Sequence, residues 1–88
     1  MNAVKHGGMR GAKFRAVLED LGFLVFADNH TRHGFFVRHA DGRPLAFYEL
    51  FHEDLAFRFG WIENEHGNGR TDCISWPELY ERITRRKA

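Results

Sequence analysis

The stretch from Leu45 to Trp61, LAFYELFHEDLAFRFGW, constrains the fold more than any other, because six of its seventeen residues are aromatic. Aromatic side chains favour β-strands, and the short charged interruption HED is typical of a turn between two of them. Just upstream, Asp41-Gly42 is a strong signal for a two-residue type I′ hairpin turn after a β-rich run over residues 33–39. The sequence therefore predicts an antiparallel meander in which these three strands are consecutive.

The two turns also predict a register. A two-residue loop at Asp41-Gly42 places Phe36 opposite Phe47, and a four-residue loop over residues 52–55 places Glu49 opposite Arg58. Both hairpins then assign the same side chains to one buried face: Phe35, Val37, Ala46, Tyr48, Leu50, Phe57, Phe59 and Trp61. The opposite face is expected to carry Gly34, Phe36, Arg38, Leu45, Phe47, Glu49, Phe51, Arg58, Gly60 and Ile62.

Helical patterns flank the predicted sheet on both sides. From Met9 to Leu21 the apolar residues recur at helical spacing, and Gly22 follows as a natural end to the helix. Nearer the end of the sequence, Ser75 and Glu78 form a capping-box pattern, which predicts a second helix that extends to about Arg86.

The predicted fold is a two-layer α+β domain in the order helix, four or five antiparallel strands, helix. Residues 23–26 supply the first strand, and residues 70–74 are the candidate fifth strand. Residues 1–8 contain two adjacent glycines and no apolar periodicity, so we expect a flexible arm there and a single domain over residues 9–88.

The cysteine content and the lengths of the apolar runs indicate in which cellular compartment the protein is expected. A single cysteine, Cys73, excludes an intrachain disulfide and is typical of a reducing setting. The apolar runs are too short to span a bilayer, and the first residues lack the pattern of a signal peptide. We therefore expect a cytoplasmic protein.

The net charge of +1 conceals a segregation of charge along the chain. Residues 1–15 and 82–88 hold eight of the thirteen basic residues and no acid, whereas all twelve acidic residues lie between them. At the end of the second helix, Arg82, Arg85 and Arg86 exceed what is needed to complement the helix dipole. Basic ends of this kind suit an acidic protein or a nucleic acid, so these arginines are candidate binding residues.

The sequence holds more rings than one core face needs. In the predicted register Phe36, Phe47 and Phe51 share the second face with Arg38 and Arg58, and we take these five as candidate partner-binding residues. Exposed aromatic patches beside arginine are typical of protein interfaces, and they also resemble stacking platforms for single-stranded nucleic acids. Burial of this face by a helix or in a homodimer is the alternative interpretation.

One family resemblance lies in the first half of the chain. The segment AKFRAVLEDLGFLVFADNHTRHGFFVRHADGR, residues 12–43, resembles the HicA-type mRNA interferases of toxin–antitoxin pairs. Those proteins run helix, strand, then a strand that carries a catalytic histidine followed by an aromatic residue. The resemblance implies that His33, with Phe36, would be the matching pair, although Thr31-Arg32 stand where the family has Gly-Ser.

Other chemistry finds little support in the sequence. No motif pairs a nucleophile with a base, and His30, His33 and His39 lack the spacing of a standard zinc site, so we expect no catalysis, metal or cofactor. We interpret the chain as a small binding protein with a protein or ribonucleoprotein partner. Its size suits regulators and inhibitors encoded by prokaryotic mobile elements, anti-CRISPR proteins among them. An RNA- or DNA-binding module is the alternative, and a HicA-like ribonuclease the third interpretation.

Overall fold

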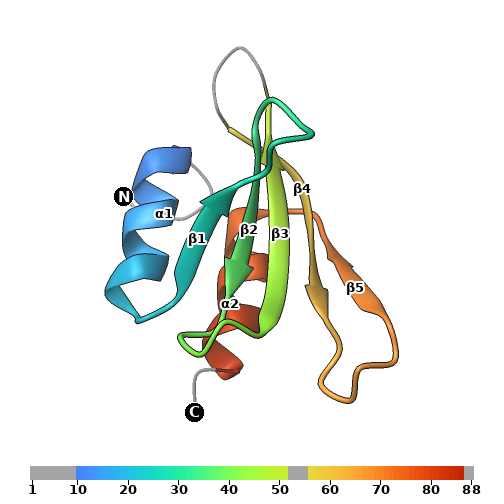
Figure 1. The fold of residues 1–88 in the computed structure, drawn as a ribbon. Coiled ribbons are helices and arrows are strands. Elements are labelled where there is room, and N and C mark those ends of the chain that lie inside the picture. Colours follow the sequence, from blue (N-terminus) through green and yellow to red (C-terminus); the bar gives the residue numbers. More distant parts are fainter. Residues whose placement is uncertain (1–9, 52–55, 87–88) are drawn as a thin grey trace.

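The computed structural model describes residues 10–51 and 56–86 of the chain (Figure 1). The elements follow in the order α1 (Gly11–Asp20), β1 (Leu24–Ala27), β2 (Gly34–Arg38), β3 (Pro44–Leu50), β4 (Phe57–Glu63), β5 (Arg70–Cys73) and α2 (Trp76–Arg85). The five strands form one antiparallel sheet in the order β1-β2-β3-β4-β5. The α+β fold and the fifth strand are thus confirmed, whereas the predicted arm over residues 1–8 lies outside the described residues.

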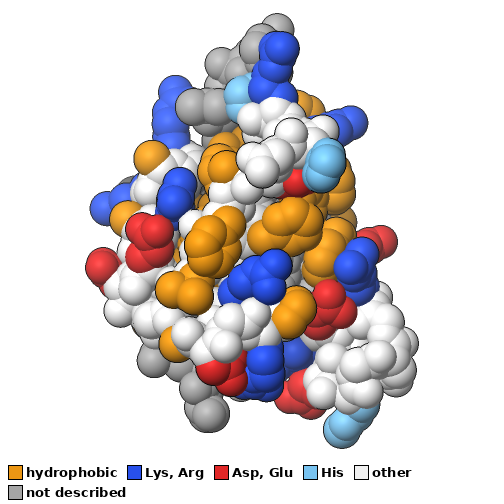
Figure 2. Space-filling model, viewed as in Figure 1, with side chains coloured by type: hydrophobic (Ala, Val, Ile, Leu, Met, Phe, Trp, Pro, Cys, Tyr) orange, Lys and Arg blue, Asp and Glu red, His pale blue; other side chains and the backbone are white. Residues whose placement is uncertain are grey.

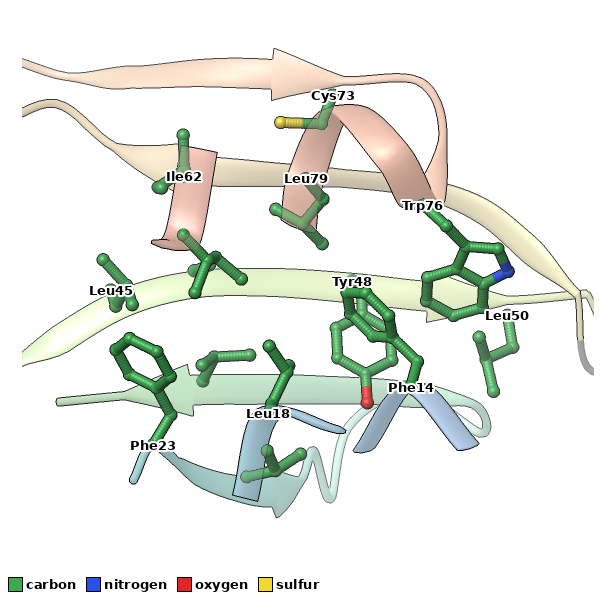
Figure 3. Packing of buried hydrophobic residues seen from close by; sticks show 14 residues of the cluster. Phe14, Leu18, Phe23, Leu45, Tyr48, Leu50, Ile62, Cys73, Trp76 and Leu79 are labelled. Carbon is green, nitrogen blue, oxygen red and sulfur yellow. The ribbon is translucent and has the colours of Figure 1, made fainter. Parts of the chain in front are cut away.

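Both helices cover the same face of the sheet. Phe14 and Leu18 of α1 and Leu79 and Ile83 of α2 are fully buried, and they share one apolar cluster with the strands (Figure 3). Within the part of the chain that the structure describes, neither helix lies over the opposite face, where hydrophobic side chains reach the surface (Figure 2). No helix in this part of the chain is both long and apolar enough to cross a membrane.

The two helices begin differently. In α2 the Ser75 hydroxyl accepts a hydrogen bond from the Glu78 backbone N–H at 3.3 Å, and the Glu78 carboxylate accepts one from the Ile74 N–H at 2.8 Å. The first contact satisfies an N–H group that the first turn of a helix leaves without a partner, and the second holds the residue directly before the N-cap. The α1 helix has Arg10 at its N-cap and no side-chain cap, and it is held instead by burial of one apolar face.

The first hairpin has the predicted strand register but a different turn. Gly42 donates its N–H to the carbonyl of His39 and has a φ of 93°, and His39 donates to Arg43, so the loop has three residues instead of two. Phe36 nevertheless faces Phe47, because Leu45 forms a bulge that restores the register between Val37 and Arg38. The predicted type I′ turn is therefore wrong, and so is the pairing of Arg38 with Leu45 that a two-residue loop would imply, because Arg38 pairs with Pro44.

The second hairpin starts as predicted and then shifts by one residue. Phe51 donates its N–H to Ala56 at 2.8 Å and Leu50 pairs with Phe57, while the predicted loop residues 52–55 lie outside the described residues. Beyond this point Glu49 pairs with Phe59, because Arg58 is an extra residue in β4.

This shift exchanges the two faces of β4. Phe59 and Trp61 were predicted in the core but lie on the opposite face, whereas Ile62 is 1% exposed and belongs to the core. Three residues expected on the second face are buried instead. Gly60 and Ile62 face the helix side, and Leu45 lies in the bulge of β3 and joins the core. The core has no need of Trp61, since Trp76 of α2 packs against Tyr48 and Phe57 with ring centroids 5.6 and 4.8 Å apart.

Candidate functional site: the open sheet face

The sheet surface that faces away from both helices is the candidate site, and we call it the open face. Its side chains come from all five strands and include the bulge residue Arg58, which contacts Glu49 and Phe59: Leu24, Phe26, Phe36, Arg38, Phe47, Glu49, Arg58, Phe59, Trp61, Glu63, Arg70 and Asp72. Figure 2 shows these hydrophobic side chains gathered over the front of the sheet, with basic and acidic side chains beside them. Figure 1, in the same view, shows the strands to which they belong.

The ring of Phe47 is the centre of this face. Its centroid lies 5.0 Å from that of Phe36, 6.1 Å from that of Phe59 and 5.7 Å from that of Trp61. These neighbours on β2 and β4 leave Phe47 only 6% exposed although neither of the described helices covers it. Offset ring contacts at such distances are favourable, so the rings form one ordered row across adjacent strands.

Gly34 makes room for the central ring. A Cβ atom at Gly34 would lie 2.8 Å from Cζ of Phe47 and would also contact the Thr31 hydroxyl oxygen. The Phe47 ring therefore lies over Gly34. Gly60 is needed for a different reason, because its Cβ would lie 2.7 Å from the Phe47 carbonyl oxygen of β3.

Two ion pairs lie on the open face. Arg58 lies 3.0 Å from Glu49, so the predicted contact between these two residues is present even though their strand pairing is not. Arg70 lies 3.5 Å from Glu63, and its guanidinium sits 3.7 Å from the centroid of the Trp61 ring. Trp61 is thus held between Arg70 and the Phe47 ring, an arrangement that fixes the indole in place.

A shallow groove of about 500 Å³ runs along β1 and β2 at one side of the face. Leu24, Phe26 and Phe36 give it an apolar wall, and Arg38 and Asp28 lie toward its two ends. The Asp28 carboxylate accepts hydrogen bonds from the backbone N–H of His30 and from the Thr31 hydroxyl, and these bonds lower the pKa of Asp28. Arg38 donates to the Gly42 carbonyl at 3.0 Å.

Four of the predicted binding residues belong to this face, namely Phe36, Arg38, Phe47 and Arg58. Phe51 is 48% exposed and follows β3, beside the loop that lies outside the described residues. Phe26, Phe59 and Trp61 were missed. Phe26 could have been found from its alternation with Val25. The face on which Phe59 and Trp61 lie is set by the bulge at Arg58, and no sequence pattern predicts that bulge.

The three predicted arginines near the end of the sequence, Arg82 and Arg85 in α2 and Arg86 directly after it, do not lie on the open face. Arg82 contacts Glu78 at 3.4 Å and Arg85 contacts Glu81 at 2.9 Å, each one helical turn away. Arg86 donates to the Glu63 carbonyl at 2.7 Å and lies 3.7 Å from the Glu65 carboxylate. Their charge is therefore largely compensated by acidic residues that the count over residues 82–88 had left out.

Two further groups bear on chemistry. His33 is half-buried directly before β2, and its carbonyl accepts the Leu50 N–H at 2.9 Å. Burial raises the pKa of the Cys73 thiol to about 11, so this cysteine is protonated and unreactive at neutral pH. Residues 10–51 and 56–86 contain no group of three or more His, Cys, Asp or Glu side chains placed to hold a metal ion.

Comparisons with known proteins do not assign the chain to a family. The chain matches no protein-family model, and no curated protein or solved structure is significantly similar to it. The resemblance of residues 12–43 to HicA-type interferases consequently stays an expectation from the sequence.

Proposed function

We propose that this chain is a small non-catalytic binding protein whose open face docks on a protein partner. The observation that carries the proposal is the row of rings that crosses β1 to β4 with no described helix over it (Figure 2). Phe26 and Phe59 expose 48% and 38% of their surface. Burying such apolar area contributes roughly 25 cal/mol per Å², so a partner that covers the row would gain affinity from it.

The charge on the face favours a protein over a nucleic acid. Its basic residues are Arg38, Arg58 and Arg70, and its acidic residues are Glu49, Glu63 and Asp72. Three cations balanced by three carboxylates give little attraction for phosphates, on which nucleic-acid affinity depends. Rings together with arginine and few uncompensated charges are the composition of a protein interface core.

The contacts on both sides of the Trp61 ring also favour a protein partner over a nucleic acid. A base that stacks on a sheet needs a free ring face, but Trp61 has Phe47 at one side and Arg70 at 3.7 Å on the other. A protein partner needs only that the row be rigid and partly exposed, because preorganised aromatic anchors lower the entropic cost of binding.

Regulation or inhibition of the partner is the activity that we infer from binding alone. A face of this size on an 88-residue chain can block or bridge a surface of a larger protein without chemistry of its own. This mode of action suits the regulators and inhibitors of prokaryotic mobile elements, anti-CRISPR proteins among them. The single free cysteine supports the accompanying proposal that the protein works in the cytoplasm.

A capture experiment with matched variants tests this function. The wild-type protein, a Phe36→Ser/Phe59→Ser variant and an Ile74→Ser control would be immobilised, and the proteins captured from nuclease-treated and untreated extracts compared. Ile74 is 83% exposed and lies outside the strands, so its replacement removes a similar apolar side chain from another surface. We expect one partner to bind the wild type and the control, to survive nuclease, and to be lost in the double variant.

Three outcomes would contradict the proposal. Retention of the partner by the double variant would place the interface elsewhere. Tight binding of single-stranded RNA or DNA at physiological salt, lost when Arg82, Arg85 and Arg86 are neutralised, would support the nucleic-acid alternative. RNA cleavage that disappears in His33→Gln would support a HicA-like ribonuclease.

A further inference from the structure

The two edges of the sheet differ in a way that bears on assembly. On β5 the exposed residues are Arg70 and Asp72, and charged side chains on an edge strand oppose pairing with another sheet. On β1 the four residues Leu24–Ala27 are all apolar, and Leu24 and Phe26 are large and exposed. The β1 edge therefore lacks the charges that protect the β5 edge, and Figure 1 shows it at the outer side of the sheet next to α1.

The hydrogen-bonding groups of this edge have a defined direction. Asp28 donates its N–H to the Gly34 carbonyl at 2.9 Å, and bonded pairs alternate along an antiparallel ladder, so Val25 and Ala27 direct their backbone groups away from β2. The Val25 carbonyl accepts a bond from Arg15 Nη2 at 3.1 Å, which agrees with this direction. Among the described residues, the Val25 N–H and both backbone groups of Ala27 form no hydrogen bond.

We propose that β1 pairs antiparallel with β1 of a second copy of this chain, about a twofold axis at Phe26. In this register Val25 of each copy lies opposite Ala27 of the other, and four backbone hydrogen bonds form between the copies. They use the outward groups of both residues in both chains. The Val25 carbonyl can keep its bond to Arg15, because a carbonyl oxygen accepts two hydrogen bonds.

Side chains on the open face are complementary in the same register. Phe26 of each copy would lie opposite Phe26 of the other in a non-hydrogen-bonded pair, where side chains approach most closely. Asp28 of the second copy would lie beside Leu24, which is paired in its own sheet with Arg38. Arg38 forms no ion pair with a carboxylate of the described residues, unlike Arg58 and Arg70, so the second copy would supply its counter-charge.

The helix side is complementary as well. Arg15 and Glu19 form an ion pair at 3.2 Å along α1, with side chains 43% and 49% exposed, and Arg15 reaches the edge of β1. A twofold axis reverses this row of charges, so Arg15 of one copy would meet Glu19 of the other. A peptide from an unrelated protein could use the backbone groups of β1, but only a second copy brings both of these charge pairs.

The dimer would have one ten-stranded sheet, with both helix pairs on one side and the open faces of the two copies joined on the other. This inference rests on the backbone groups of the β1 edge and is tested separately from the partner proposed for the open face, although both proposals involve Phe26. It adds that the partner meets two equivalent rows of rings, which strengthens binding if the partner itself has two sites.

Sedimentation equilibrium of the full chain over micromolar to millimolar concentrations tests the dimer. We expect the mass to rise to twice the 10.3 kDa of one chain. Phe26→Lys, which sets two like charges opposite each other, should weaken dimerisation at least about tenfold. Ala27→Pro should do so independently, because it removes an outward N–H and leaves the bonded pairs with β2 intact.

Two controls separate this edge from other surfaces. Phe59→Lys places the same charge on the open face away from β1, and Asp72→Pro places proline at an outward position of β5. Both variants should dimerise as the wild type does, and circular dichroism would confirm that all four variants are folded. A wild-type mass that stays at one chain throughout would overturn the proposal, as would a dimer that persists in folded Phe26→Lys or is lost in Phe59→Lys.

Discussion

The two faces of the sheet contain similar side chains but bury them by different means. On the helix side Tyr48 of β3 is 1% exposed because the two helices cover it, and Trp76 of α2, which packs against it, is 2% exposed. On the open face Phe47 reaches 6% exposure through Phe36, Phe59 and Trp61, which cover it from neighbouring strands. A low exposure therefore does not distinguish a core from a surface cluster. The loss of unfolding free energy on removing a ring should, however, differ between the two faces.

The largest effect is expected on the helix side. Trp76→Ala should reduce the free energy of unfolding by about 3–5 kcal/mol, because it leaves a cavity between Phe14, Tyr48 and Phe57 that the rest of the core cannot fill. Urea denaturation followed by circular dichroism measures this change. A loss below about 1 kcal/mol would mean that α2 does not pack on the sheet as described.

A smaller effect is expected at the centre of the open face. Phe47→Ala should cost about 2 kcal/mol, since solvent can enter the space that the ring leaves. Phe59→Ala should cost below about 1 kcal/mol, because Phe59 is already 38% exposed. This order is the reverse of the one that the predicted register implies, where Phe59 is a core residue. Equal losses for Phe59→Ala and Trp76→Ala would restore that register.

The buried thiol of Cys73 makes the stability of the fold depend on pH in the alkaline range. Burial raises the pKa of Cys73 to about 11, above the value of 9.0 for an unperturbed thiol. The folded state holds this proton more tightly than the unfolded chain, so the stability from Cys73 is complete below pH 9 and decreases as the pH rises toward 11. The decrease should be smaller in Cys73→Ala than in the wild type when both are denatured in urea at pH 8 and pH 10.5.

The smallest effect is expected from the ion pairs of the open face. Arg58→Ala should cost only about 0.2–1 kcal/mol, because its contact with Glu49 is solvent-exposed and screened by salt. Arg70→Ala is the useful comparison, since Arg70 also covers the Trp61 ring and its loss should change the Trp61 fluorescence. An Arg58→Ala cost that is larger and independent of salt would show that this pair is shielded from solvent.

The fold was predictable where local patterns decide it. The capping box at Ser75, the helical spacing around Phe14 and the turn signals between strands gave the order of elements correctly. The pairing of Phe36 with Phe47 was also predicted, although it arises from a three-residue turn and a bulge at Leu45 whose effects on the register cancel.

The candidate site was only partly predictable, because two kinds of information are missing from local patterns. The bulge at Arg58 places Phe59 and Trp61 on the open face and Ile62 in the core, and no local pattern indicates where a strand takes up an extra residue. The charge count near the end of the sequence suggested free arginines, but helical spacing pairs Arg82 and Arg85 with Glu78 and Glu81. Such pairs could have been found from their spacing of four residues.

The chain has one tryptophan on each face, so acrylamide quenching of single-tryptophan variants tests the two-faced sheet most directly. Trp76→Phe leaves Trp61 on the open face, and Trp61→Phe leaves Trp76 in the core, where it is 2% exposed. We predict that the fluorescence of Trp61 is quenched several-fold more strongly than that of Trp76, and that a bound partner protects Trp61 alone. Equal and weak quenching of both in the free protein would contradict the account, because it would mean that the open face is covered.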